Sequence, residues 1–437
     1  MYTQQLPYTE NTAELFEHFV QLPYAIFFDS CFFLQKQGRY DIITADPSIV
    51  ISKSNDTFAD VQCALMDLKN KADCDNPYHL PFTIGAMGYL SYDIGRQLEN
   101  IPALAIDDIA IPQAVVGIYD WSIVVDHIDK KIFFTSLYAF DHPKIKNIFK
   151  LLNQTPVVKK DFSVTKNFQS NMTKSFYDAA FQKIKENIND GNCYQVNLAQ
   201  RFSAEFTGSP WHAYQLLREK NPAPYAVFMQ LNNAAILSMS PERFLKVTDR
   251  VVETKPIKGT SKRFADPILD QASADELCRS EKDRAENVMI VDLLRNDLSG
   301  ACIAGSVKTP KLCALESFSN VHHLVSRVTG KLAPHQTSLN LLQRCFPGGS
   351  ITGAPKIAAM KIIESLEPHR RSLYCGSLFY IDIHDNCDSN IAIRTVICDD
   401  NKMHCYAGGG IVYDSESDKE YAETWAKVGR MIGILSG

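Results

Sequence analysis

The sequence lacks the features that mark membrane, secreted and disulfide-stabilised proteins. None of its apolar runs, such as Ala25–Phe28 or Val288–Val291, approaches the roughly 20 residues of a spanning helix. No Lys or Arg precedes Lys36, so the cationic start of a signal peptide is missing. None of the twelve cysteines forms a C-x-x-C pair. We therefore expect reduced thiols and a cytoplasmic protein.

An excess of positive charge is also missing. The net charge is −5, which argues against nucleic acid or an anionic membrane as the main partner. Hydrophobic residues make up 45% and charged residues 22% of the 437 positions, a mixture typical of globular proteins. The chain can therefore bury a large core without disulfides.

Two packed regions are expected along the chain. The polar stretch 153–174 is the best candidate junction, but it is not the Gly/Ser-rich segment of a flexible linker. We place an N-terminal region at residues 1–165 and a catalytic region at residues 166–437.

Local patterns predict several elements of the second region. Helices are expected after the N-cap Thr173 and at 280–298, 356–366 and 419–434. Val288, Val291 and Leu294 are expected on the apolar side of the helix at 280–298. Strands are expected at 194–201 and 234–239. The alternation of Ile391, Ile393, Thr395 and Ile397 with other residues predicts another strand.

A glycine-rich loop, FPGGSITGAPK, occupies residues 346–356. It is not a Walker A loop, because Ala354 rather than Lys follows Gly353. It leads into a helix whose first N–H groups could bind an anion, or it is an ordinary loop before a helix. The glycines of 408–410 lie inside a strand pattern and indicate either a bulge or close approach to a ligand.

Charged residues leave similar alternatives. Lys258 lies between Ile257 and Gly259, and it is either a solvated lysine or a nucleophile whose pKa is lowered by burial or by a nearby cation such as Lys255. Glu286 precedes an apolar helix core, and Glu423 could pair with Lys427 one turn on. Carboxylates from two helices could equally hold Mg²⁺.

Ten segments together resemble the chorismate-utilising enzymes, in the same order and over nearly the whole chain. They are PFTIGAMGYLSYD (81–93), GNCYQVNLAQR (191–201), SPERF (240–244), PIKGT (256–260), ENVMIVDLLRNDL (286–298), NVHHLVSRV (320–328), PGGSITGAPK (347–356), IRT (393–395), AGGGIVYDS (407–415) and ETWAK (423–427). The resemblance implies an α/β fold, with two antiparallel sheets packed as an orthogonal sandwich and flanked by helices. It also implies an N-terminal tryptophan pocket, for which Ser30 and Tyr40 are candidates, although the family's Leu-Glu-Ser is Phe28-Asp29-Ser30 here.

The branch of the family is indicated by two residues. Anthranilate synthases typically carry Ala in place of Lys258, and isochorismate synthases typically carry Lys in place of Gln195. The combination of Gln195 and Lys258 resembles the aminodeoxychorismate synthase branch, which serves 4-aminobenzoate and folate synthesis. Anthranilate synthase component I, or a non-catalytic sensor of aromatic ligands on the same scaffold, are the alternatives.

The resemblance implies a covalent mechanism. Lys258 would add at C2 of chorismate while the C4 hydroxyl leaves, with Glu242 as its general acid. Ammonia would then add at C4 and expel Lys258. The chain contains no cysteine in the Gly-Cys elbow of a glutaminase, so a glutamine amidotransferase partner is expected to supply ammonia.

The remaining site residues are also implied by the resemblance. Mg²⁺ held by Glu286 and Glu423 would bind the ring carboxylate. The other substrate-binding residues would be Gly259, Thr260, His323, Thr352, Tyr380, Arg394, Gly408, Gly410 and Lys427.

Overall fold

Two antiparallel sheets form the centre of the protein in this computed structural model, which describes residues 1–35, 38–72, 75–159, 161–317 and 321–437. The first sheet has twelve strands, whose order along the main path is β1-β8-β7-β3-β2-β11-β12-β21-β22-β10-β18, with β9 paired to β10. Its strands are β1 (Tyr2–Leu6), β2 (Ile26–Asp29), β3 (Tyr40–Thr44), β7 (Trp121–Asp126), β8 (Lys131–Ser136), β9 (Phe162–Ser170), β10 (Gln195–Gly208), β11 (Tyr225–Gln230), β12 (Ala234–Ser240), β18 (Gly353–Ala354), β21 (Thr395–Asp399) and β22 (Lys402–Ile411).

The second sheet has ten strands in the order β15-β17-β14-β13-β20-β19-β5-β6-β4, with β16 paired to β17. Its strands are β4 (Ile49–Ile51), β5 (Gly85–Leu90), β6 (Ala114–Tyr119), β13 (Arg243–Thr248), β14 (Val251–Thr254), β15 (Ile257–Lys262), β16 (Lys308–Ser317), β17 (Val321–Lys331), β19 (Ser377–Asp382) and β20 (Cys387–Asn390). The predicted pair of antiparallel sheets is confirmed.

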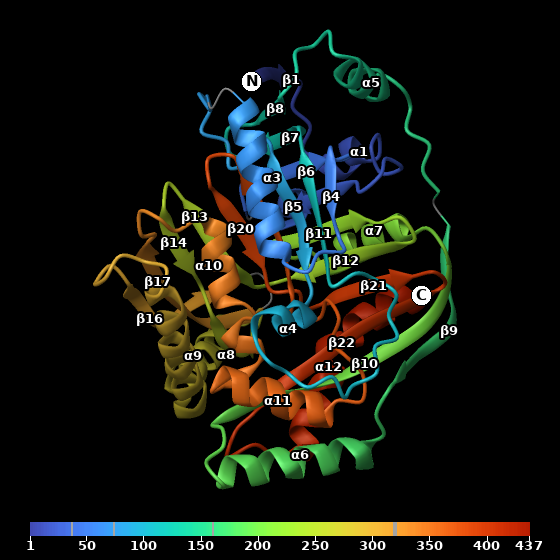
Figure 1. The fold of residues 1–437 in the computed structure, drawn as a ribbon. Helices are drawn as coiled ribbons and strands as arrows, with labels where there is room; N and C mark the ends of the chain where they lie inside the picture. Colours follow the sequence, from blue (N-terminus) through green and yellow to red (C-terminus); the bar gives the residue numbers. More distant parts are fainter. Residues whose placement is uncertain (36–37, 73–74, 160, 318–320) are drawn as a thin grey trace.

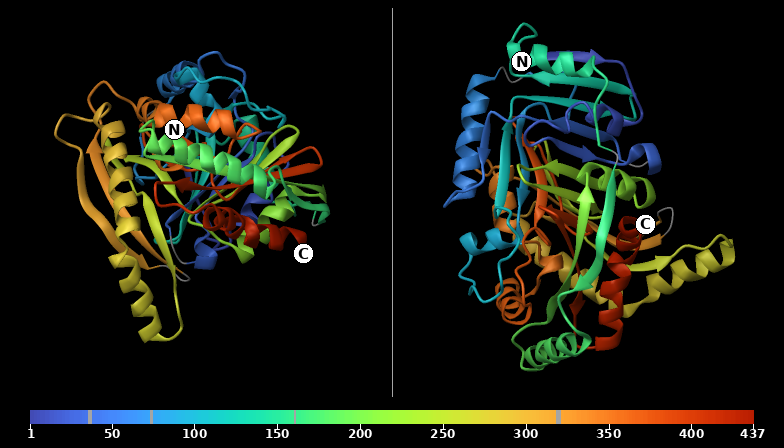
Figure 2. Two further views of the ribbon diagram at one scale, coloured as in Figure 1. Left: turned by 90° about the horizontal axis from the view of Figure 1, so that it is seen from below. Right: turned by 90° about the vertical axis from the view of Figure 1, so that its right-hand side faces the viewer.

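Helices cover the outer faces of both sheets (Figure 1). The long ones are α3 (Thr57–Lys71), α5 (Pro143–Leu152), α6 (Lys174–Asn189), α7 (Pro210–Lys220), α8 (Pro267–Arg279), α9 (Glu281–Ser299), α10 (Ser338–Cys345), α11 (Lys356–Leu366) and α12 (Ser417–Ser436). Short helical segments are α1 (Thr12–Phe16), α2 (Phe32–Gln35), α4 (Gly95–Leu98) and the 3₁₀ turns Tyr92–Ile94 and Gly349–Ile351. Figure 2 shows α8 and α9, in yellow, projecting from the body beside β16 and β17. Among the described residues, no helix is long and apolar enough to cross a membrane.

The core lies between the sheets. One hydrophobic cluster combines Val124 and Ile236 of the first sheet with Met87, Val116 and Phe379 of the second. A second cluster covers the far face of the first sheet under α1, α5, α7 and α12, and a third packs α6 and α11 on β10. Both sheets combine strands from residues 1–165 with strands from residues 166–437, and residue 165 lies inside β9.

Most of the predicted elements are present, but two predictions need correction. Thr173 caps α6 through the amide of Phe176, and α11 spans 356–366 as predicted. Val288, predicted to lie on the apolar side of α9, is 46% exposed, and Asn287 is buried instead. The predicted strand over 391–397 begins only at Thr395, because Arg394 adopts a left-handed backbone with φ 52°.

The eleven cysteines that the structure describes are free thiols, in agreement with the expected reduced state. Cys74 lies outside the described residues.

Candidate active site

Glu242 lies immediately after β12, where the chain passes from the first sheet into β13 of the second. Its amide donates to Ser240 Oγ (3.2 Å), and Ser240 Oγ donates to the carbonyl of Ile391 (2.6 Å). Burial raises the pKa of the Glu242 carboxyl to about 7, although Lys258, the Ser350 hydroxyl and Lys427 oppose the shift. A carboxyl group with this pKa can hold a proton near neutral pH, as a general acid must.

Lys258 enters the site from a bulge in β15. It lies opposite Leu324 of β17, and the register shifts between Lys258 and Thr260. Gly259 between them has φ +81°, and a Cβ there would lie 3.0 Å from the Asp283 side chain of α9. Glycine is therefore needed for the backbone conformation and is favoured by the close approach of the helix.

The charge of Lys258 acts on carboxylates from two separate elements. It lowers the pKa values of both Glu242 and Glu286, which burial raises. No ion pair or hydrogen bond of the Lys258 amine occurs within the described part of the chain. The amine is therefore near enough to act on both an acid and a candidate metal ligand, and it has no fixed partner among the described residues.

Three side chains of α12 face the same region. Lys427 Nζ lies 2.5 Å from Glu423 Oε1 and donates to the carbonyl of Gly408 (2.8 Å). Glu420 accepts a hydrogen bond from Ser415 Oγ (2.8 Å), and its Oε2 lies 2.8 Å from the position of a Cβ on Gly409. A side chain at Gly409 would displace this carboxylate, so the glycine strand allows α12 to pack closely against β22.

The acidic residues in the site are suited to a hard divalent cation. Burial raises the pKa values of Glu286 and Glu420. The negative charge of Glu420 raises the pKa of Glu286 further, and the negative charge of Glu423 raises the pKa of Glu420 further. A divalent cation would relieve this repulsion between converging carboxylates. Within the described ranges, no three His, Cys, Asp or Glu side chains form a closed metal centre. Mg²⁺ commonly takes only one or two carboxylates, with water and substrate oxygens as its other ligands.

His323 and Thr260 lie beside the bulge. Thr260 Oγ1 and His323 Nδ1 are 2.8 Å apart, and burial lowers the pKa of His323. The charge of Arg394 contributes to this lowering, so the guanidinium is near enough to act on His323. Burial also lowers the pKa of the Arg394 guanidinium, and no carboxylate of the described residues pairs with it. A desolvated guanidinium without a counter-ion is suited to a carboxylate of a ligand.

Strands β10 and β22 form another wall. A Cβ on Gly410 would lie 2.2 Å from Gln195 Nε2, and one on Gly408 would lie 2.6 Å from Asn197 Oδ1. Gln195 is fully buried, yet neither its Nε2 nor its Oε1 has a hydrogen-bond partner among the described residues. Buried amides are normally satisfied, so this amide is available to a ligand or to an ordered water.

Thr352 lies in the glycine-rich loop, but its hydroxyl is used within that loop. It donates to the carbonyls of Gly348 (3.0 Å) and Gly349 (3.3 Å). Ser350 of the same loop donates to Glu242 Oε1 at 3.4 Å. The loop thus faces the candidate acid through Ser350.

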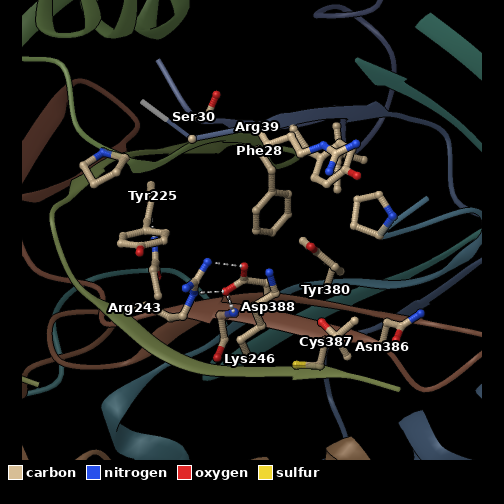
Figure 3. Close-up of a pocket in the computed structure, with 18 of the residues that line it drawn as sticks. Phe28, Ser30, Arg39, Tyr225, Arg243, Lys246, Tyr380, Asn386, Cys387 and Asp388 are labelled. Carbon is tan, nitrogen blue, oxygen red and sulfur yellow. Dashed lines mark hydrogen bonds and ion pairs between the residues drawn. The ribbon is translucent and has the colours of Figure 1, made fainter. Parts of the chain in front are cut away.

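Tyr380 lies apart from the residues described above. It lines a cavity of about 670 Å³ with Ser30 and Tyr40, where its ring packs edge-on against Phe28. Figure 3 shows Phe28 pointing into this cavity between Tyr225 and Tyr380. The tyrosine that acts on Arg394 is Tyr374, which opposes the lowering of the Arg394 pKa and whose ring stacks on Tyr406.

The cavity has an aromatic interior and a charged edge. Arg243 forms two hydrogen bonds with Asp388 on one wall, and Lys246 and Arg39 also line the cavity (Figure 3). The amide and hydroxyl of Ser30 both donate to Asp41. Asp29 is turned away to Arg218 and Tyr214.

Three residues around the site, Glu420, Ser350 and Tyr374, were not among the predicted site residues. The sequence does show that Glu420 shares a helix face with Glu423 and Lys427. Ser350, Tyr374 and the role of the Gln195 amide depend on contacts between distant segments, for which the local sequence carries no signal.

Known proteins resemble this chain over nearly its whole length. A family model of chorismate binding enzymes matches residues 28–433. Aminodeoxychorismate synthase component 1 of Klebsiella aerogenes is 42% identical in an alignment of 445 positions, gaps included, that covers 98% of each chain. The corresponding protein of Escherichia coli K12 is 42% identical in an alignment of 446 positions that covers 98% of this chain and 97% of its own. The crystal structure of anthranilate synthase component I from Streptococcus pneumoniae TIGR4 matches with a TM-score of 0.81 and 30% identity, over 90% of this chain and 92% of that one.

Proposed function

The chain belongs to the family of chorismate binding enzymes, and from this premise we propose that it performs the component 1 reaction of an aminodeoxychorismate synthase. Chorismate and ammonia are converted to 4-amino-4-deoxychorismate and water. The observation that carries the proposal is the position of Lys258, which has no ion-pair partner among the described residues and whose charge acts on both Glu242 and Glu286. The full-length relatives named aminodeoxychorismate synthase component 1 support the same branch.

The first half of the reaction replaces the C4 hydroxyl by a bond at C2. The Lys258 amine forms a bond to C2, the ring double bonds shift, and the C4–O bond breaks. Glu242 donates its proton to the departing oxygen, which leaves as water. General acid assistance of this kind is worth about 10²–10⁴-fold.

The second half places nitrogen at C4. Ammonia forms a bond to C4, the double bonds shift back, and the bond between C2 and Lys258 breaks. The ammonium formed at C4 returns a proton to Glu242, so that both residues regain their starting states. The enolpyruvyl group is retained throughout.

The substrate carboxylates require compensating positive charge. Arg394, with Tyr374 beside it, would bind the enolpyruvyl carboxylate next to Gly408 and Gly410. Glu286, Glu420 and Glu423 would hold Mg²⁺, which supplies charge compensation for the ring carboxylate when it is bound. His323, Thr260 and Gly259 would line the ring, and Lys427 holds Glu423 and the backbone of Gly408 in place.

Two further roles complete the proposal. A glutamine amidotransferase partner would deliver ammonia, as the designation component 1 of the relatives implies a second component. The cavity around Ser30, Tyr40 and Phe28 would bind tryptophan, whose indole fits an aromatic interior and whose charged backbone groups fit the edge.

Product analysis tests the proposed reaction. The purified chain is incubated with chorismate, Mg²⁺ and ammonium, and the product is identified by mass. We expect 4-amino-4-deoxychorismate. Anthranilate, which has lost pyruvate, would assign the chain to the other amination branch, and bound but unconverted chorismate would indicate a sensor.

A further inference from the structure

Arg371 is a buried cation behind the glycine-rich loop. Its side chain is 1% exposed and makes four hydrogen bonds. Nε and Nη2 donate to the two oxygens of Glu367 (2.9 and 2.7 Å). Nη1 donates to the carbonyl of Ile351 (3.0 Å), and Nη2 also donates to the carbonyl of Asn197 (2.8 Å). The guanidinium therefore joins the loop to strand β10.

The surrounding contacts reinforce this junction. Asn197 Nδ2 donates to the same Ile351 carbonyl (2.9 Å), and the Asn197 amide donates to the carbonyl of Thr352 (2.8 Å). Glu367 in turn accepts from the amide of Ala199 (2.9 Å). The loop is thus held by one charged pair and by the backbone and side chain of β10.

The loop carries the hydroxyl that contacts the general acid. Ser350 Oγ donates to Glu242 Oε1 at 3.4 Å. The charged and titratable groups that face Glu242 from other elements are Lys258 of β15, Lys427 of α12 and Cys375. Displacement of the loop would remove the hydroxyl and leave these three groups in place.

We propose that Arg371 is a positioning residue for proton donation: it holds residues 348–352 where Ser350 contacts Glu242, although it touches neither Glu242 nor the substrate. The inference rests on the proposed function, because it assigns the role of acid to Glu242.

The chemistry of arginine explains why this residue type is used. A planar guanidinium can donate to a carboxylate with two N–H groups and still reach two carbonyls in other directions, which an ammonium cannot do with the same geometry. A buried ion pair is seldom the most stable filling for a core, so its presence is better explained by the geometry that it enforces.

The test uses Arg371→Lys, Ser350→Ala and the double variant, with Arg370→Lys as the matched control. Arg370 is the adjacent arginine, and it pairs with Asp107 (2.6 Å) outside the loop. For each variant the pH dependence of kcat for C4 amination is measured at saturating chorismate and ammonia. Loss of the hydroxyl removes a hydrogen bond that favours ionised Glu242, so the alkaline limb moves to higher pH.

We expect Arg371→Lys and Ser350→Ala to move the limb by the same amount, and the double variant to move it no further. Arg371→Lys also lowers kcat by about tenfold or more, whereas Arg370→Lys leaves the limb in place. An unmoved limb in Arg371→Lys, or shifts that add in the double variant, would overturn the inference. If Arg371→Lys does not fold, Glu367→Gln loosens the same guanidinium and is judged by the same criteria.

Amide hydrogen exchange separates this inference from the proposed function. Exchange of residues 348–352 should be faster in Arg371→Lys than in Arg370→Lys, whether or not the protein turns over chorismate. Equal exchange in the two variants refutes the proposed positioning role of Arg371. Faster exchange in Arg371→Lys, together with a wild-type protein that forms no 4-amino-4-deoxychorismate, supports this positioning role and refutes the proposed function.

Discussion

At the scale of single residues, the site depends on pairing a buried acid with an amine that has no fixed partner in the part of the chain that the structure describes. Glu242 follows a strand that ends at the junction of the two sheets, and Lys258 projects from a bulge. The sequence motifs identified both residues. They did not reveal that the charge of Lys258 also lowers the pKa of Glu286, because this effect joins residues of β15 and α9.

Replacement of Lys258 should change the product as well as the rate. Lys258→Ala removes the nucleophile, so C4 amination should fall by at least about 10²-fold, with some ammonia adding at C2 instead. Lys258→Arg should not restore activity, because a guanidinium keeps its charge. Product ratios by mass spectrometry are the measurement. Full C4 amination in Lys258→Arg would contradict a covalent role.

The protonation of Glu242 predicts opposite effects on activity and stability. Its pKa is raised to about 7, so the acid form is lost, and kcat should fall, as pH rises through that value. Ionisation in the buried site costs folding free energy: this cost is absent below about pH 4.5 and complete above about pH 7.

Glu242→Gln should therefore abolish amination. At pH 8, its free energy of unfolding should exceed that of the wild type by about 1–3 kcal/mol, so it should unfold at a higher temperature. At pH 4 the two proteins should have equal stability. Thermal unfolding at both pH values is the measurement, and a variant less stable than the wild type at pH 8 would contradict the assigned burial cost.

Tyr380 and Tyr374 show the limit of motif matching at this scale. Both lie close to the Cys375-Gly376 turn, and both are tyrosines in an apolar context. Only the tertiary structure separates them. Ser372 and Cys375 have positive φ, and the following strand β19 places Tyr380 in the aromatic cavity that also contains Phe28, away from Arg394.

At the scale of elements, helices α9 and α12 bring the carboxylates of Glu286, Glu420 and Glu423 into the candidate active site. Periodicity predicted both helices closely, because their caps and apolar positions are local features. The same periodicity misassigned Val288, since the projecting α9 is covered by sheet on only one side. The prediction of a strand at 391–397 was wrong for residues 391–394, because Arg394 has a left-handed backbone conformation that a strand does not allow. Strained backbone conformations of this kind are found most often at functional sites.

Removal of one carboxylate from either helix should weaken metal binding. Glu286→Gln and Glu423→Gln should each lower Mg²⁺-dependent turnover by more than about tenfold, with unchanged circular dichroism. Glu281→Gln is the control, because Glu281 is an exposed residue of the same helix as Glu286. Titration calorimetry with Mg²⁺ and chorismate reports binding directly. Wild-type affinity in both site variants would exclude these ligands.

The aromatic cavity between the sheets predicts a second ligand. L-tryptophan should bind at one site per chain, and Phe28→Ala should weaken its binding by about tenfold, because the ring lines the centre of the cavity. Phe33→Ala, which alters an exposed phenylalanine, should not. Calorimetry decides between these results, and no heat with millimolar L-tryptophan would contradict the prediction.

At the scale of the whole molecule, the two sheets share strands from both regions of the chain. Sequence composition predicted packed regions rather than separate domains, but the strand order could not be predicted, because neighbours such as β2 and β11 are about 200 residues apart. The active-site residues come from strands β10, β15, β17 and β22, from helices α9 and α12, and from the loops and turns that carry Glu242, Ser350 and Arg394. Recognition of the family could therefore identify the site, whereas spacing alone could not.

The chain should need a partner to use glutamine. With ammonium it should aminate chorismate, and with glutamine alone it should release no glutamate at a useful rate. Addition of a purified glutaminase component should restore glutamine-dependent activity. Glutamate release by the chain alone would contradict this prediction.

The covalent role of Lys258 is tested most directly by mass analysis of the protein itself. The enzyme is incubated with chorismate and Mg²⁺ in the absence of ammonia, quenched and digested. A covalent role predicts that the peptide containing Lys258 gains the mass of chorismate less water, and that ammonia discharges this adduct as 4-amino-4-deoxychorismate. An unmodified peptide from enzyme that proceeds to C4 amination once ammonia is added would contradict it.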